Sequence, residues 1–242
     1  MKFYYLCLFL LPFLVSCSDS VATTVNPSSV KHYSPSFSRA FEPMAANPNN
    51  PFDGVGQIHD ELLAAYFADD NLPTTLYGIA NRVSLLAVGN TSFNSLSTTP
   101  YSFHSLERVG YISSHLDTCT PEIIENSLDT SAAKLSLTNY ISSLMSLCAT
   151  ENDYAVIYSF IVSYEATVLG TSSFTSRDKM VILKTASISR FSAYTRKKRP
   201  KKNRDPEWDY MVGNIIAGAD GADEGSQERI IKALIVGVWE NQ

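Results

Sequence analysis

The sequence contains few of the residues from which metal centres and activated nucleophiles are usually built. Its 242 residues include 4 cysteines, 4 histidines and 2 tryptophans. None of the C-x-x-C, H-E-x-x-H, G-x-S-x-G, P-loop or dinucleotide-binding glycine motifs occurs. We therefore expect no cofactor, and a non-catalytic role is favoured over an enzyme.

Charged residues are also scarce, at 18% of the chain, and the formal net charge is −5. A basic run at 196–204 concentrates much of the positive charge, and no aromatic residue accompanies it. This balance argues against a nucleic-acid partner. The run is interpreted as a solvated loop between two helices; the alternative is contact with anionic lipid or an envelope polyanion. The side chains concerned are Arg196, Lys197, Lys198, Arg199, Lys201, Lys202 and Arg204.

The N-terminus has the form of a secretory signal. Met1-Lys2 precedes an apolar run, Phe3 to Phe13, that is too short to span a bilayer. The following Leu14-Val15-Ser16-Cys17 resembles a bacterial lipobox. This resemblance implies a lipoprotein signal peptide at 1–16 and a lipid on Cys17, which would hold the chain to a membrane. The alternative is an ordinary signal peptide with Cys17 incidental.

The residue after the cysteine indicates which membrane would hold the protein. It is Ser18 rather than the aspartate of the usual inner-membrane retention signal. We therefore expect a lipid-anchored protein of the cell envelope, in the outer membrane. Neither its exposed face nor its oligomeric state follows from the sequence.

The remainder divides into a tether and a folded domain. Residues 17–50 are rich in Ser, Pro, Asn and Thr and bury too little apolar surface to fold, which predicts a disordered tether. Residues 51–242 show helical periodicity almost throughout. We predict an all-α fold, a single multi-helix domain of orthogonal or bundle-like form. The predicted buried stripes centre on residues 76–87, 137–148, 180–194, 208–216 and 230–238.

Two segments within the domain leave some choice. Residues 154–169 are apolar on nearly every side and rich in β-branched and aromatic residues, so a buried strand competes with a helix. Their length favours a central helix wrapped by the others. Residues 90–100 are mostly Thr, Ser and Asn and are interpreted as a loop.

The start of the domain carries the most distinctive motif, Asn50-Pro51-Phe52-Asp53, followed by Gly56 and His59. It resembles the opening motif of uncharacterised Bacteroidetes lipoproteins, in which Asn-Pro-aromatic-Asp/Glu leads through a glycine to a histidine. The resemblance implies localisation and lineage rather than a reaction. It also implies that a cluster of residues matters together: Asp53, Gly56, His59, Asp60 and Glu61.

The chemistry of this motif has two interpretations. In the first, Asp53 caps a helix whose buried stripe includes His59, bonded there to a carbonyl or carboxylate. In the second, Asp53, His59 and Glu61 form the centre of a hydrolase or metal-dependent enzyme. Because His59 lies on the apolar face of the predicted helix, the first, structural interpretation is favoured.

Two other features stay open at this stage. Cys119 and Cys148 are paired by a disulfide if the protein is exported, or Cys148 is a plain core residue. Ser176-x-x-Lys179 matches one element of penicillin-binding enzymes but lacks the companion elements, so Ser176 is interpreted as a helix N-cap.

Overall fold

The computed structural model describes the backbone of residues 45–198, 207–221 and 224–242, and the side chains of these ranges outside 196–198 and 207–211. All regular secondary structure in these ranges is helical, which confirms the all-α prediction. The helices are α1 (Asp53–Tyr66), α2 (Leu76–Gly89), α3 (Thr91–Asn94), α4 (Leu106–Ser114), α5 (Leu116–Ser127), α6 (Ser131–Thr150), α7 (Tyr154–Gly170), α8 (Ser176–Lys198), α9 (Glu207–Asp220) and α10 (Ser226–Glu240).

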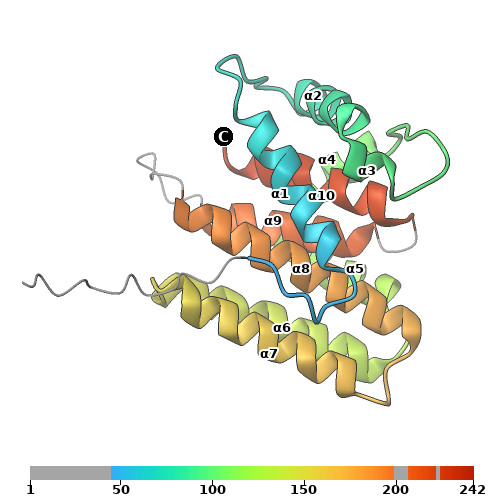
Figure 1. The fold of residues 1–242 in the computed structure, drawn as a ribbon, viewed down its shortest axis with the longest axis vertical. Coiled ribbons are helices and arrows are strands. Elements are labelled where there is room, and N and C mark those ends of the chain that lie inside the picture. Colours follow the sequence, from blue (N-terminus) through green and yellow to red (C-terminus); the bar gives the residue numbers. More distant parts are fainter. Residues whose placement is uncertain (1–44, 199–206, 222–223) are drawn as a thin grey trace, which may run out of the picture. The chain divides into compact units, whose positions relative to one another are not determined.

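The helices surround α8 and α10. Figure 1 shows α6 and α7 side by side along one flank of α8, with α1 and α9 on its other side. Helix α10 packs against α9 and α1 and carries α2 and α4 on its far side. Segments far apart in the sequence therefore meet in one hydrophobic core.

The central helices are α8 and α10, which corrects the prediction that residues 154–169 form the central helix. Those residues do form a helix, α7, but it buries a single stripe and leaves Val156 and Leu169 exposed. In α8 every residue from 181 to 193 is buried, including Lys184 and Arg190. The sequence predicted a buried stripe at 180–194 but not burial on every side, because a helix with many polar residues is expected at the surface.

Other periodic stripes lie where the sequence placed them. Helices α2 and α6 bury Ile79, Val83, Leu137 and Leu144, among others of the predicted positions. The segment predicted as a loop holds one helical turn, α3, because the Asn90 side chain caps it and its one phenylalanine is fully buried.

Small residues at every fourth position of α9, namely Gly213, Ala217 and Gly221, let α9 and α10 approach closely. A Cβ on Gly213 would lie 2.9 Å from Val236 Cγ1, and one on Gly221 would lie 2.6 Å from Arg229 Cα. Ala217, between them, is fully buried. The stripe is therefore a packing surface within the domain.

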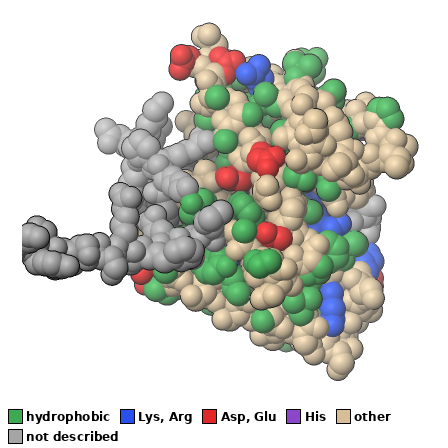
Figure 2. All heavy atoms as spheres, in the orientation of Figure 1, with side chains coloured by type: hydrophobic (Ala, Val, Ile, Leu, Met, Phe, Trp, Pro, Cys, Tyr) green, Lys and Arg blue, Asp and Glu red, His purple; other side chains and the backbone are tan. Residues whose placement is uncertain are grey.

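The folded domain begins before residue 51. Ala45, Asn47 and Asn50 are already buried, so the predicted tether ends too late by these residues. The rest of the tether and the predicted signal peptide lie outside the described residues. Among the described helices, none is both long and apolar enough to cross a membrane. On the face drawn in Figure 2, hydrophobic side chains are scattered among polar ones.

Candidate functional site

The opening motif is joined to the core by a buried ionic network. Glu165 on α7 and Arg190 on α8 are both fully buried. The Glu165 carboxylate accepts hydrogen bonds of 2.7 Å from the side-chain amides of Asn47 and Asn50. Arg190 lies 3.2 Å from Glu165 Oε1 and donates to Asp53 Oδ1 at 2.5 Å. Burial alone would lower the pKa of Arg190, but the two carboxylates raise it above its ordinary value.

This network holds the chain segment ahead of α1 in place. Arg190 also donates to the Ala45 carbonyl, and the Tyr158 hydroxyl donates to the Ala46 carbonyl at 2.9 Å. Asp53 does not cap α1 as predicted, since its Oδ1 accepts from the Asn47 amide and from Arg190. A carboxylate engaged in this way serves as an anchor for the segment.

Gly56 lets α1 approach α8 at the same place. Its amide donates to Ser187 Oγ at 3.0 Å, and that hydroxyl donates to the Asp53 carbonyl at 2.9 Å. A Cβ on Gly56 would lie 2.6 Å from a ring carbon of Phe191. The motif residues Asp53 and Gly56 thus meet on one serine, which gives them a shared structural role.

His59 lies on the buried stripe of α1, as the first interpretation expects, but with another partner. Its Nε2 is 3.3 Å from Asn214 Oδ1 on α9, and Asn214 Nδ2 donates to Ser192 Oγ at 3.0 Å. Because an amide oxygen only accepts, the neutral ring carries its proton on Nε2. Burial lowers the pKa of His59 to about 4, although the Asn214 bond acts in the opposite direction. The predicted backbone carbonyl or carboxylate partner is replaced by a side-chain amide.

The remaining members of the predicted cluster face other partners. Asp60 accepts from the Thr195 hydroxyl. Glu61 accepts from Gln57 at 3.0 Å and from Asn90 at 3.4 Å. Within the described ranges, no three His, Cys, Asp or Glu side chains are grouped so as to hold a metal ion. The structure therefore does not bring Asp53, His59 and Glu61 together as one centre.

The two cysteines of the domain are buried on different helices. Cys119 lies in the first turn of α5 and Cys148 in the last turn of α6, and the structure does not join them in a disulfide. Counted at 1.5 Å per residue from the short connection at 128–130, Cys119 is about 12 Å away and Cys148 about 25 Å. A disulfide needs Cα atoms about 6 Å apart, and two cysteines at such different distances from the connection between their helices do not meet this requirement. Both cysteines have the burial of core residues.

Three further predicted features are the lipidation site, the basic run and the cap at Ser176. Cys17 lies outside the described residues. The backbone of α8 continues to Lys198, beyond the predicted start of the basic loop, but the side chains of the run at 196–204 are also outside them. Ser176 begins α8, yet the cap is Thr175, whose hydroxyl accepts from the Asp178 amide at 3.0 Å.

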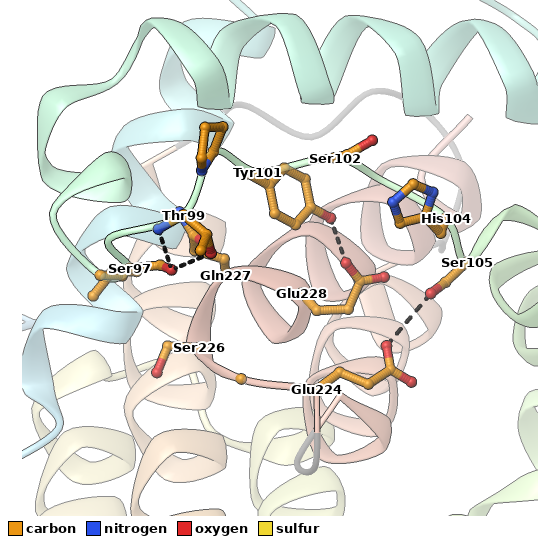
Figure 3. Close-up of a pocket in the computed structure, with 13 residues that line it drawn as sticks. Ser97, Thr99, Tyr101, Ser102, His104, Ser105, Glu224, Ser226, Gln227 and Glu228 are labelled. Atoms are coloured by element: carbon orange, nitrogen blue, oxygen red, sulfur yellow. Dashed lines mark hydrogen bonds between the residues drawn. The ribbon is translucent and has the colours of Figure 1, made fainter.

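A cavity lies where the segment at 96–105 passes over the first turn of α10 (Figure 3). Its volume is about 510 Å³, within the range of small-molecule sites. The lining is mainly polar and includes Tyr101, His104, Ser105, Glu224, Ser226 and Glu228. The sequence did not predict this cavity, because the segment at 96–105 and α10 are brought together only by the fold.

An acidic side chain forms part of the cavity wall. Glu228 is 7% exposed, and its Oε2 accepts from the Tyr101 hydroxyl at 2.5 Å. Among the described residues, its Oε1 has no hydrogen-bond partner. Burial, followed by the bond to Glu228, raises the pKa of Tyr101 far above its usual value. The phenol therefore remains a hydrogen-bond donor throughout the ordinary pH range.

The acidic turn between α9 and α10 is held by basic side chains from two helices. Lys232 Nζ donates to Asp220 Oδ2 and Glu224 Oε1, both at 2.9 Å. Arg108 on α4 donates to Asp220 at 2.6 Å. Burial would raise the pKa of Asp220, but Arg108 and Lys232 lower it below its usual value. Lys232 thereby joins the carboxylates of Asp220 and Glu224, and Glu224 lines the cavity.

Beneath the cavity lies a buried lysine that sequence reasoning missed. Lys184 on α8 is 7% exposed, and its Nζ donates to Ser226 Oγ at 2.8 Å. It stands 5.3 Å from the centre of the Phe52 ring. Burial, together with the positive charge of Arg229, lowers the pKa of Lys184 to about 8. The available signal was a lysine directly after the apolar run 181–183.

The Ser-Lys pair noticed in the sequence is a different one and has no such geometry. Lys179 Nζ donates to the Leu169 carbonyl at 2.8 Å, at the exposed end of α7.

Compared with known proteins, the chain matches no family model, no curated protein and no solved structure.

Proposed function

We propose that this chain is a lipid-anchored cell-envelope protein, held at the outer membrane through Cys17, whose helical domain binds a small polar ligand. The anchoring half of the proposal is supported by the apolar run and the Leu-Val-Ser-Cys sequence at 14–17. The observation that carries the binding half is the cavity of about 510 Å³ above the first turn of α10. Its hydroxyl, carboxylate and imidazole groups suit a ligand rich in hydrogen-bonding groups.

The distribution of charged groups favours this role over an enzyme centred on the opening motif. Asp53 is hydrogen-bonded to Arg190 and His59 to Asn214. Glu61 accepts hydrogen bonds from Gln57 and Asn90. The His59 ring is fully buried, so a substrate does not reach it without opening the fold. Anionic lipid or an envelope polyanion remains a proposed second partner, through the basic run at 196–204.

Mass spectrometry of the full-length protein, expressed in a bacterium that acylates lipoproteins, tests the anchor. The expected product begins at Cys17 and carries fatty acyl groups, and Cys17→Ser abolishes both acylation and membrane retention. Cys7→Ser is the matched control, because Cys7 lies in the segment expected to be removed and its loss leaves the product unchanged. A mature wild-type chain without acyl groups contradicts the proposal.

A titration of the cavity tests the binding half separately. A panel of monosaccharides and amino acids is screened against the full chain by NMR chemical-shift perturbation. Ligands that bind the cavity are expected to shift the resonances of residues 96–105 and 224–228. The double variant Ser105→Ala, Glu228→Gln is expected to bind these ligands more weakly. Shifts confined to other parts of the chain contradict a ligand site at this cavity.

A further inference from the structure

The floor of the cavity pairs a hydroxyl with a buried amine. Ser226 is the first residue of α10 and lines the cavity, while Lys184 approaches it from α8 with Nζ 2.8 Å from Oγ. We propose that Ser226 is a nucleophile and Lys184 its general base in the hydrolysis of a carboxylic ester or amide held in the cavity. This activity goes beyond the proposed binding function and uses neither Asp53 nor His59.

The environment of Lys184 favours a neutral amine. Its charged neighbour on α10 is Arg229, also a cation, which donates to the Val181 carbonyl at 3.0 Å. The segment ahead of α1 presents the Phe52 ring rather than a carboxylate. With a pKa of about 8, roughly a tenth of Lys184 is neutral at pH 7 and most of it above pH 8. Only the neutral amine accepts the serine proton.

The position of Ser226 supplies the second requirement, stabilisation of an oxyanion. Gly225, the residue before Ser226, is the N-cap of α10 and has no side chain with which to cap the helix. The amides of the first turn therefore receive no hydrogen bond from a capping side chain. Amides at a helix N-terminus stabilise negative charge that develops beside them. The Gln227 amide directly follows the nucleophile, the position from which such a donor commonly acts in serine hydrolases.

The reaction balances with water as the second substrate. Ser226 Oγ attacks the acyl carbon while Lys184 Nζ takes the hydroxyl proton. The bond from the acyl carbon to the leaving oxygen or nitrogen then breaks, and Lys184 returns the proton to the leaving group. Water, deprotonated by Lys184, attacks the acyl carbon of the acyl-serine; the bond to Oγ breaks, Lys184 returns the proton to Oγ, and the carboxylic acid and free Ser226 are released.

A fluorophosphonate probe tests the nucleophile in the full-length protein. Attack by Ser226 forms an O–P bond and expels fluoride, and peptide mass spectrometry locates the adduct. We expect the adduct on Ser226, with a labelling rate that rises about tenfold per pH unit below pH 8 and levels off above it. Ser226→Ala abolishes the labelling. Ser143→Ala, a change in an exposed serine of α6 that does not line the cavity, leaves it unchanged.

Two lysine variants separate a base from a structural bond. Lys184→Met keeps the length of the side chain without a proton acceptor, and we expect labelling at least about 100-fold slower at pH 8.5. Lys184→Arg keeps a charged donor to Ser226 but does not deprotonate in this range, so it is expected to be equally slow. Circular dichroism of each variant serves as the control for folding.

Three results overturn the proposal. They are the absence of an adduct on Ser226 at pH 9.5, an unchanged rate in folded Lys184→Met, and a wild-type rate that is flat between pH 6.5 and 9. The first and third need no variant, so they decide the question even if both lysine variants unfold. None of these outcomes bears on the acylation of Cys17.

Discussion

The buried His59 makes the stability of the domain depend on pH in a predictable direction. In the folded protein burial lowers the pKa of His59 to about 4, against 6.5 for an unperturbed histidine. The unfolded chain therefore binds a proton that the folded chain does not, wherever the pH lies between these values. The contribution of this group to stability is fully present above pH 6.5 and is lost as the pH falls toward 4.

The magnitude follows from the two pKa values. Between them the free energy of unfolding falls by about 1.4 kcal/mol per pH unit on account of this residue. From pH 8 to pH 5 the loss is about 2 kcal/mol, a sizeable share of the 5–15 kcal/mol typical of a folded domain.

Urea unfolding of the wild type and of His59→Gln, each at pH 8 and pH 5, isolates this effect. All other titratable groups are the same in the two proteins, so the difference between the two pH dependences belongs to His59. We expect the wild type to lose about 2 kcal/mol more than His59→Gln. Equal pH dependences, or an NMR titration of His59 near 6.5 in the folded protein, would refute the reasoning.

Two further substitutions test the packing of the domain. Glu165→Gln leaves the buried Arg190 without one of its two carboxylates and is expected to lower the free energy of unfolding by about 3–5 kcal/mol in urea melts, whereas Glu107→Gln on the surface of α4 changes it by less than about 0.5 kcal/mol. Gly237→Ala places a Cβ 2.6 Å from Asn214 Cγ and is expected to cost about 1–3 kcal/mol; Gly170→Ala, with no atom within 4 Å, is its control, and equal stabilities of the two would contradict the close approach of α9 and α10.

The opening motif shows how far a local pattern reaches. The spacing of Ile58, His59 and Leu62 placed the histidine on a buried face, and the structure confirms it. The same pattern did not identify Asn214 as its partner, because that residue is 155 positions away. Ser187 contacts the backbone of both Asp53 and Gly56, whereas the expectation that these residues and His59 matter together stays a prediction.

Helix α8 shows where the pattern fails. Its buried stretch contains Lys184 and Arg190, residues that a hydrophobic pattern assigns to the surface. Each is tolerated in the core because distant elements supply hydrogen-bond partners: Ser226 for Lys184, and Asp53 and Glu165 for Arg190. The cost of burying a polar group depends on such partners, and they are invisible within one helix.

The sequence by itself determined the helical class, most of the helix positions and the buried stripes of α1, α2 and α6, since these depend on periodicity within about four turns. The spacing of Gly213, Ala217 and Gly221 indicated that another helix can approach α9 closely, and the structure shows that this helix is α10. Only the tertiary structure decided that α8 is central, that Glu165 and Arg190 hold the opening motif, and that Lys184 meets Ser226 beneath a cavity. These are pairings across long sequence separations, fixed by how the helices pack rather than by what any one of them contains.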